Sequence, residues 1–413
     1  MRQRLCFLAA AAALVLAAWW ALCPRGAPPA GGEPLAPVTV VVAADLHVLA
    51  PELTDRGPLF QNLTGYSDGK VMDRIWELTD AFCAQMERLG PDVLILAGDL
   101  TFNGERASHE YLAARLEALR RAGVAVLVLP GNHDLENPMA ASFHGADYMP
   151  TESVSPEDFA ALYAPFGYDG ALSRDGASLS YTARIAPGLR ALLIDANTPA
   201  APGTVTEETL AWAEEQLCQA AAVGDRVIAV SHQTVLPHST LFVEGCAMEG
   251  RRALLELYER YGVVCALAGH MHIQHTAQSG GRVWELVTSA LSVSPDQYGV
   301  LELEGREASY RTEAVEVPPS EGEPFDSWAA DFFRRSAYRQ ILPELAGLED
   351  AQAAADFWVE ASAAYFAGRP DRIDWAAQPR VFRDHPAAFL SRYLQSIAAE
   401  GARDHTALTF SFS

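Results

Sequence analysis

The sequence predicts an α/β fold, in which mixed β-sheets carry helices on the outside, followed by a small all-helical domain. Between about residues 37 and 316, short runs rich in β-branched residues alternate with helical stretches, which is typical of an α/β sandwich. The proline-rich segment Val317–Pro324 ends this alternation. After it the chain is rich in alanine, aromatic residues and arginine, so residues 320–413 are expected to form a helical domain or cap.

β-Strands are expected at short apolar runs that are bounded by turn residues. In chain order these runs are Thr39–Ala44, Val93–Ala97, Val124–Leu129, Ser178–Arg184, Ala191–Asp195, Arg226–Val230, Val263–Ala268, Arg282–Val287, Gly299–Leu303 and Ala308–Thr312. The last three have no helix between them, so we expect them to pair as antiparallel neighbours.

Helices are expected where apolar residues recur every three or four positions. The stretch Val71–Leu89 places Ile75, Leu78, Phe82 and Met86 on one face. Similar patterns predict helices over Ser108–Arg121, Glu207–Ala222, Arg251–Tyr261, Phe325–Leu342, Asp350–Ala367 and Ala387–Ala399. The last three of these would form the helical C-terminal domain.

Composition limits the kinds of partner. The 413 residues are 50% hydrophobic and 20% charged, which is the composition of a folded globular protein. The formal net charge of −23 repels polyanions, so we expect no binding to duplex nucleic acid. A small anionic substrate is still compatible with this charge, because bound cations reverse the sign of the local field.

The N-terminal residues 1–36 are expected to be a signal peptide or a membrane anchor with a spacer. Arg2 and Arg4 precede an apolar run over Leu5–Leu22, and a Pro/Gly/Ala segment follows. The apolar run is also close to the length that spans a bilayer. Both alternatives place the body of the protein outside the cytoplasm, either secreted or anchored to the outer face of the membrane.

Five short blocks carry side chains that bind metals. They contain Asp45 and His47, Asp99, Asn132 with His133 and Asp134, His232, and His270 with His272. Each block follows a predicted strand, and ligands in open α/β sheets bind beyond the carboxyl ends of the strands. The five blocks are therefore expected to meet at one edge. Gly98, Gly131 and Gly269 precede candidate ligands, where tight turns need glycine.

The chemistry of these side chains favours a transition-metal site. Carboxylates and imidazoles together suit Fe, Mn or Zn and not a calcium cage. Taken singly each block is weak evidence, because Asp99 or Asn132 can be an ordinary turn residue after a strand. The presence of all five blocks, each after a predicted strand, favours a metal site.

In this order the five blocks resemble the signature of the calcineurin-like metallophosphoesterase family, over roughly residues 38–290. The resemblance implies a metallophosphoesterase-type α/β sandwich and two divalent or trivalent metal ions, Fe or Mn before Zn. It implies that Asp45, His47 and His272 hold one ion, that Asn132, His232 and His270 hold the other, and that Asp99 bridges both. His133 would be a catalytic histidine beside the substrate phosphate, and Asp134 would orient it through its other ring nitrogen.

The same resemblance implies a mechanism and a substrate class. A hydroxide that bridges the two metal ions would attack phosphorus, and His133 would stabilise the developing charge or protonate the leaving oxygen. The stretches after Asp99, His232 and His272 resemble the bacterial class III cyclic-nucleotide phosphodiesterases, which often carry a C-terminal helical domain. This implies a phosphodiesterase acting on cyclic or other nucleotides, with Asn103 on the substrate phosphate.

Other functions stay open on the sequence. A phosphomonoesterase, or a nucleotide or sugar-nucleotide pyrophosphatase, would use the same chemistry. A surface binding protein with a vestigial metal site is the alternative from a different class.

Two further groups of residues also have two interpretations. His109, His238 and His275 either line the pocket or support it, or they are ordinary structural histidines. Aromatic residues of the helical domain, such as Trp358 and Trp375, either stack on a base or fill a core, and helical spacing favours the core.

Overall fold

A computed structural model describes residues 33–319, 322–348, 350–385 and 388–412. The predicted signal peptide or anchor therefore lies outside the described residues, apart from its last positions. Within the described part of the chain, no helix is both long and apolar enough to cross a bilayer.

One sheet has six strands in the order β15-β14-β13-β1-β2-β3. Their bounds are β1 Leu35–Ala43, β2 Val93–Ala97, β3 Val126–Leu129, β13 Gln297–Gly305, β14 Glu307–Ala314 and β15 Ala407–Ser411. β1, β2 and β3 run parallel, whereas β13, β14 and β15 pair antiparallel. The parallel half of this sheet carries the first three metal-type blocks.

The second sheet has seven strands in the order β11-β12-β10-β9-β8-β7-β6. Their bounds are β6 Ser173–Arg174, β7 Tyr181–Ala186, β8 Leu189–Ile194, β9 Arg226–Ser231, β10 Cys265–Ala268, β11 His275–Ser279 and β12 Val283–Val287. β8, β9, β10 and β12 are parallel. A separate hairpin is formed by β4 (Ala141–His144) and β5 (Asp147–Pro150).

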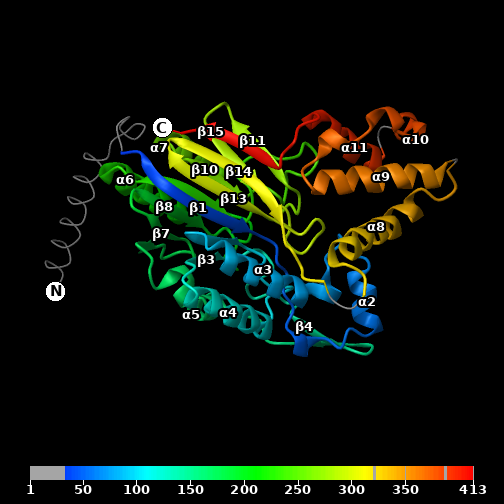
Figure 1. Cartoon of the computed structure of the whole chain (residues 1–413), viewed down its shortest axis with the longest axis horizontal. Helices are drawn as coiled ribbons and strands as arrows, with labels where there is room; N and C mark the ends of the chain where they lie inside the picture. Colours follow the sequence, from blue (N-terminus) through cyan, green and yellow to red (C-terminus); the bar gives the residue numbers. More distant parts are fainter. Residues whose placement is uncertain (1–32, 320–321, 349, 386–387, 413) are drawn as a thin grey trace, which may run out of the picture.

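The helices flank the sheets and form a lobe beyond their edge (Figure 1). Their bounds are α2 Pro58–Thr64, α3 Ile75–Leu89, α4 Arg106–Arg121, α5 Pro156–Leu162, α6 Glu207–Val223, α7 Arg251–Tyr261, α8 Phe325–Glu344, α9 Ala351–Phe366, α10 Arg380–Asp384 and α11 Phe389–Glu400. Short helical turns are η1 Pro51–Leu53, η2 Met72–Arg74, η3 Ala164–Tyr168, η4 Pro370–Arg372 and η5 Trp375–Ala377.

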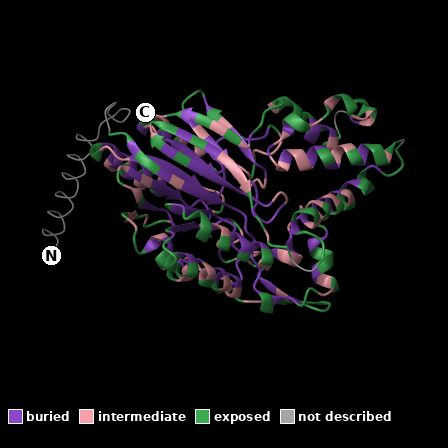
Figure 2. Cartoon of the chain, in the orientation of Figure 1, coloured by how far each residue is buried: buried purple, intermediate pink, exposed green. Residues whose placement is uncertain are grey.

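The two sheets pack face to face, which confirms the predicted α/β sandwich. Alternate residues of the second sheet divide between two cores. Leu193 and Ile228 join the core shared with the six-stranded sheet, whereas Leu192 and Ala229 pack under α6 and α7. Both faces are covered, so the central strands are buried throughout (Figure 2), as expected for parallel strands between layers.

One strand pairing was predicted wrongly. β12 pairs with β11 and β10 in the second sheet, and not with β13. The reason lies in residues 288–296, which cross from one sheet to the other. There Leu291 N donates to Ala44 O at 2.9 Å and Ser292 Oγ donates to Asp45 O at 2.8 Å. The crossing segment therefore also supports the first metal-type block.

The C-terminal region is helical but not entirely so. α8, α9 and α11 enclose a core of their own, which includes Ile341, Val359 and Leu394. The expectation of an all-helical end is wrong for β15, because Ala407–Ser411 returns to pair with β14. Phe410 packs into the main core, and β15 covers a strand that would otherwise be an open sheet edge.

Candidate metal centre and active site

All five metal-type blocks lie beyond the carboxyl ends of parallel strands. Asp45 and His47 follow β1, Asp99 follows β2, Asn132 follows β3, His232 follows β9 and His270 follows β10. Backbone hydrogen bonds join these turns, because Asp45 N donates to Gly98 O and Gly269 N donates to His232 O, each at 3.0 Å. The sheet edge thus brings together segments that are far apart in the sequence.

A first group of ligand atoms comes from Asp45, His47, Asp99 and His272, which all lie within 4.8 Å of one another. His47 Nε2 is 3.3 Å from His272 Nε2, and His272 Nε2 is 3.3 Å from Asp45 Oδ1. Asp99 Oδ2 lies 3.8 Å from His47 Nε2. Two imidazole nitrogens and two carboxylates therefore point at one position.

A second group comes from Asp99, His232 and His270. His232 Nε2 is 3.3 Å from Asp99 Oδ1 and 3.2 Å from His270 Nδ1. The side-chain oxygen of Asn132 lies 3.1 Å from the same nitrogen of His232. The two groups share Asp99, so its carboxylate is placed between them with one oxygen toward each.

Two features of these side chains fit bound cations. Asp45 Oδ1 is buried and accepts no hydrogen bond from the described residues, although a buried carboxylate oxygen without a donor is costly. The Nε2 atoms of His47 and His272 lie 3.3 Å apart and point toward the same group of carboxylate oxygens. A cation between them would satisfy both nitrogens and the orphaned oxygen.

Electrostatics favour positive charge at both groups. Burial alone would raise the pKa of Asp99, but the neighbouring imidazoles, His232 foremost, hold it well below its usual range. Burial would lower the pKa of His272, yet Asp68 and Asp45 raise it to about 10. Asp99 likewise raises the pKa of His232 to about 9 against the effect of burial. A metal ion would compete with these protons, so its affinity should fall as the pH falls.

The backbone is strained at the same residues. Asp45, His47, Asp99, His270 and His272 all have positive φ, between 48° and 68°. Non-glycine residues rarely adopt this conformation, and it costs of order 1–3 kcal/mol each. Such strain persists where the surrounding structure holds it in place, typically at functional sites.

The glycines that precede ligands are needed for close packing, as predicted. A Cβ on Gly98 would lie 2.5 Å from the ring of His232, and one on Gly131 would lie 2.2 Å from both the backbone nitrogen and Oδ1 of Asp99. No side chain fits at either position.

His133 lies beside the two groups and not within them. Its Nδ1 donates to Phe102 O at 2.8 Å and lies 3.1 Å from the side-chain oxygen of Asn103. The other nitrogen, Nε2, is 3.9 Å from Asp99 Oδ2. The side chain is 33% exposed, which leaves Nε2 open to a substrate. Asn103 therefore lies next to His133.

The predicted role of Asp134 is wrong. Its Oδ1 accepts from the backbone nitrogen and hydroxyl of Thr101, and its Oδ2 accepts from Leu100 N and Gly131 N. His133 is oriented by the Phe102 carbonyl instead. The fully buried Asp134 holds together the turns that carry Asp99 and Asn132, because it accepts from backbone donors of both turns.

Three other histidines are buried and lie outside the two groups of ligand atoms. His109 is buried and contacts the hydroxyl of Tyr163 at 2.9 Å and the carbonyl of Asp134 at 3.1 Å. His238 and His275 are buried against each other, with Nδ1 atoms 2.9 Å apart. The aromatic residues of the helical region also pack internally, as expected of a core, since Trp358 and Tyr365 lie in its hydrophobic cluster.

Asp68 is a site residue that the sequence pattern did not indicate. Its carboxylate makes a short hydrogen bond with His272 Nδ1. No motif surrounds it, because it lies in the loop after α2 and is 204 residues from His272. Only the folded chain brings the two together.

Comparison with known proteins agrees with this geometry. The model of the calcineurin-like phosphoesterase family matches residues 38–274. A protein of Xenorhabdus bovienii named a probable cyclic nucleotide phosphodiesterase is 21% identical over 239 residues, which cover 57% of this chain and 81% of that protein. A glycerophosphodiester phosphodiesterase of Enterobacter lignolyticus is 29% identical over 185 residues, which cover 44% of this chain and 56% of that protein.

Among solved structures, a dimetal phosphatase from Danio rerio has the same fold, with a TM-score of 0.50 at 16% identity. That similarity covers 68% of this chain and 97% of the other. The chain belongs to the calcineurin-like phosphoesterase family. It is a metallophosphoesterase, an enzyme that hydrolyses phosphoesters, and its clustered carboxylates and imidazoles are suited to divalent metal ions.

Proposed function

We propose that this protein is a dinuclear metallophosphodiesterase that acts on nucleotide diesters, cyclic nucleotides among them. The observation that carries the proposal is the position of Asp99, which offers one oxygen to each of two groups of ligand atoms. Similarity to proteins named as phosphodiesterases supports the diester preference.

The donor set supports iron or manganese, with zinc as the alternative. Imidazole and carboxylate ligands in mixed sets suit these metals. Asp45, His47 and His272 would hold one ion, while Asn132, His232 and His270 would hold the other. Two such ions, when bound, supply an activated water and neutralise charge on the phosphoryl oxygens.

The protein's own contribution to the chemistry is centred on His133. Its Nδ1–H bond to the Phe102 carbonyl fixes the ring so that Nε2 faces the metal groups. As an imidazolium it can donate a proton from Nε2 to the leaving oxygen of the substrate. The nearby amide of Asn103 is suited to hydrogen bond a phosphoryl oxygen, because it offers donors without adding negative charge.

We also propose that the enzyme works outside the cytoplasm. Arg2, Arg4 and the apolar run over Leu5–Leu22 support this location. An enzyme there would meet nucleotides released by decay, including 2′,3′-cyclic products of RNA hydrolysis. Fractionation of cells that express the full chain tests the location, and recovery in the cytoplasm alone would refute it.

The test of function is a substrate panel with the metal-reconstituted enzyme. The panel contains bis-p-nitrophenyl phosphate, p-nitrophenyl phosphate, 3′,5′-cyclic and 2′,3′-cyclic nucleotides, each with Mn²⁺ or Fe²⁺. We expect the diesters to be cleaved faster than the monoester. A clear preference for the monoester would overturn the diesterase proposal.

Two variants separate the metal site from general effects. Asp99→Asn replaces the shared carboxylate by a neutral amide, and it should abolish both turnover and the binding of two metal ions side by side. Asp80→Asn makes the same chemical change at an exposed ion pair with Arg115, 2.7 Å long and away from the site, and should leave activity unchanged. Equal activity in both variants would contradict a role for Asp99.

A further inference from the structure

His272 is the one candidate ligand whose ring contacts a carboxylate on both sides. Its Nε2 faces Asp45 Oδ1 at 3.3 Å. Its Nδ1 makes a short hydrogen bond with Asp68 Oδ2. Asp68 comes from the loop between α2 and η2 and belongs to none of the blocks that supply the other ligands.

We propose that Asp68 is a positioning residue, which holds His272 in the tautomer and orientation needed to bind one of the two metal ions. The inference rests on the metal site of the proposed function. A metal takes the lone pair of a neutral imidazole nitrogen, so the ring proton must sit on the other nitrogen. A carboxylate at Nδ1 accepts that proton's hydrogen bond, which leaves Nε2 free for the metal.

The other candidate histidine ligands lack such a partner among the described residues. His232 Nδ1 donates to Ala97 O at 2.9 Å, and His270 Nε2 donates to Gly245 O at 2.9 Å. His47 Nδ1 is buried without a hydrogen-bond partner. An anionic acceptor makes the ligand more basic than a carbonyl does, so His272 should be the strongest imidazole donor of the first group.

Asp68 is itself held in place. Lys70 Nζ lies 3.4 Å from Asp68 Oδ1, and the Lys70 backbone bridges to Val293 in the segment that crosses between the sheets. These contacts orient the carboxylate while leaving Oδ2 for His272.

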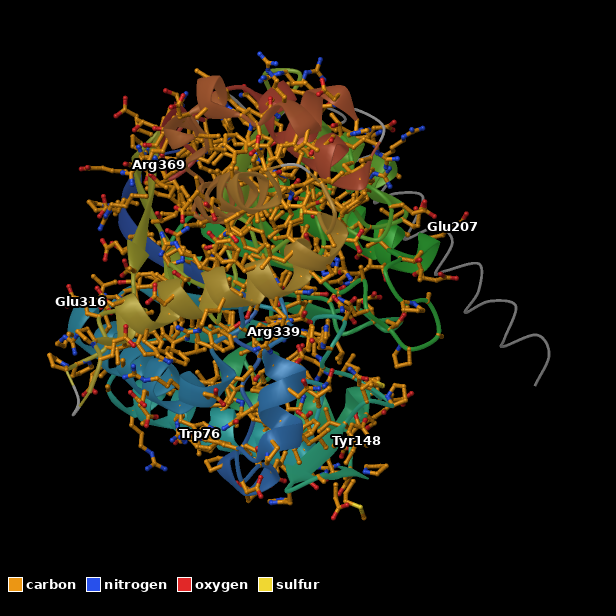
Figure 3. All side chains as sticks on the ribbon, turned by 90° about the vertical axis from the view of Figure 1, so that its right-hand side faces the viewer. Trp76, Tyr148, Glu207, Glu316, Arg339 and Arg369 are labelled. Carbon is orange, nitrogen blue, oxygen red and sulfur yellow. The ribbon has the colours of Figure 1, made fainter. Side chains whose placement is uncertain are left out.

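α8 supports the same loop from the other side. Gln340 Nε2 donates to Ser67 O at 2.7 Å, and Arg339 extends from α8 toward α2 (Figure 3), with its guanidinium 5.1 Å from the Tyr66 ring. Gly69 lies so close to Phe333 that a Cβ would be 2.7 Å from the ring. The helical region thus reaches the metal centre through the loop that carries Asp68.

The test measures Mn²⁺ binding to the full chain by calorimetry. Asp68→Ala removes the acceptor, and we expect the affinity of one of the two sites to fall roughly 10–100-fold, as is usual when a partner of a metal-ligating histidine is lost. The second site, which does not use His272, should keep its affinity. Asp68→Asn keeps an oxygen that can accept from Nδ1–H, so its effect should be smaller.

Asp80→Asn is the matched control and should bind both ions as the unaltered protein does. The proposal is overturned if Asp68→Ala binds Mn²⁺ like the unaltered protein, or if both sites weaken equally. Should Asp68→Ala fail to fold, Asp68→Asn decides the question by the same two criteria. Because binding and not turnover is measured, a protein that loads both ions but cleaves no diester would refute only the proposed function.

Discussion

Replacing Glu400 by Gln is expected to change how the stability of this protein depends on pH. Glu400 ends α11 and joins a buried row of polar side chains between the helical region and the second sheet. Its Oε2 is 3.1 Å from His275 Nε2. His275 Nδ1 is 2.9 Å from His238 Nδ1, and His238 Nε2 is 3.0 Å from Glu285 Oε2.

The donors and acceptors along this row indicate that Glu400 holds a proton where it meets His275. Glu285 accepts from the backbone nitrogens of Val235 and Leu236, and His238 Nε2 donates to it at 3.0 Å. His238 Nδ1 then accepts from His275 Nδ1, and His275 Nε2 is left as an acceptor. The contact with Glu400 is a hydrogen bond only if Glu400 carries the proton.

The shift in pKa gives the magnitude. Burial raises the pKa of Glu400 to about 7, against the lowering effect of the Tyr365 hydroxyl, from an ordinary value of 4.5. The difference corresponds to at most about 3 kcal/mol, since one pKa unit is about 1.36 kcal/mol. The folded chain holds the proton of Glu400 more tightly than the unfolded chain. The contribution of this proton to the free energy of unfolding is therefore complete below pH 4.5 and is lost as the pH rises to about 7.

The assay compares urea unfolding of the unaltered protein and Glu400→Gln between pH 5 and pH 8. The amide can donate to His275 and accept from Tyr365 without titrating, so the variant should gain relative stability as the pH rises, by up to about 3 kcal/mol. Glu344→Gln, at an exposed position on α8, is the control and should follow the unaltered protein. A difference that stays constant across this range would refute the reasoning.

Three further outcomes are expected. His133→Asn should lower kcat by roughly 10²–10⁴-fold with unchanged metal content, and loss of metal would contradict its place outside the ligand set. Gly131→Ala places a Cβ 2.2 Å from Asp99 and should lower the metal content of the purified protein, measured by atomic emission; full occupancy would argue against the packing constraint. Asp134→Ala leaves buried donors at Leu100 and Gly131 unpaired and should lower the free energy of unfolding by at least about 3 kcal/mol. A loss below about 1 kcal/mol would show that water replaces the carboxylate.

The sequence alone determined the α/β fold and the clustering of the five metal-type blocks. Each block is a local signal, in which an apolar run is followed by a turn with ligand-type side chains. The rule that sites form beyond the carboxyl ends of strands then indicates that they meet. The positions of Gly98 and Gly131 could be predicted for the same reason, since close packing after a strand needs glycine.

Only the tertiary structure decided which distant segments touch. β12 joined the second sheet and β15 returned to the first, because strand pairing depends on the layers that surround a strand as well as on its own residues. The contact between Asp68 and His272 and the row from Glu285 to Glu400 have no sequence motif, and the block that contains Asp134 does not show which four donors surround its carboxylate. These contacts join side chains from separate turns of the two stacked sheets and of the helical region. The close packing of the surrounding residues fixes the distances between them.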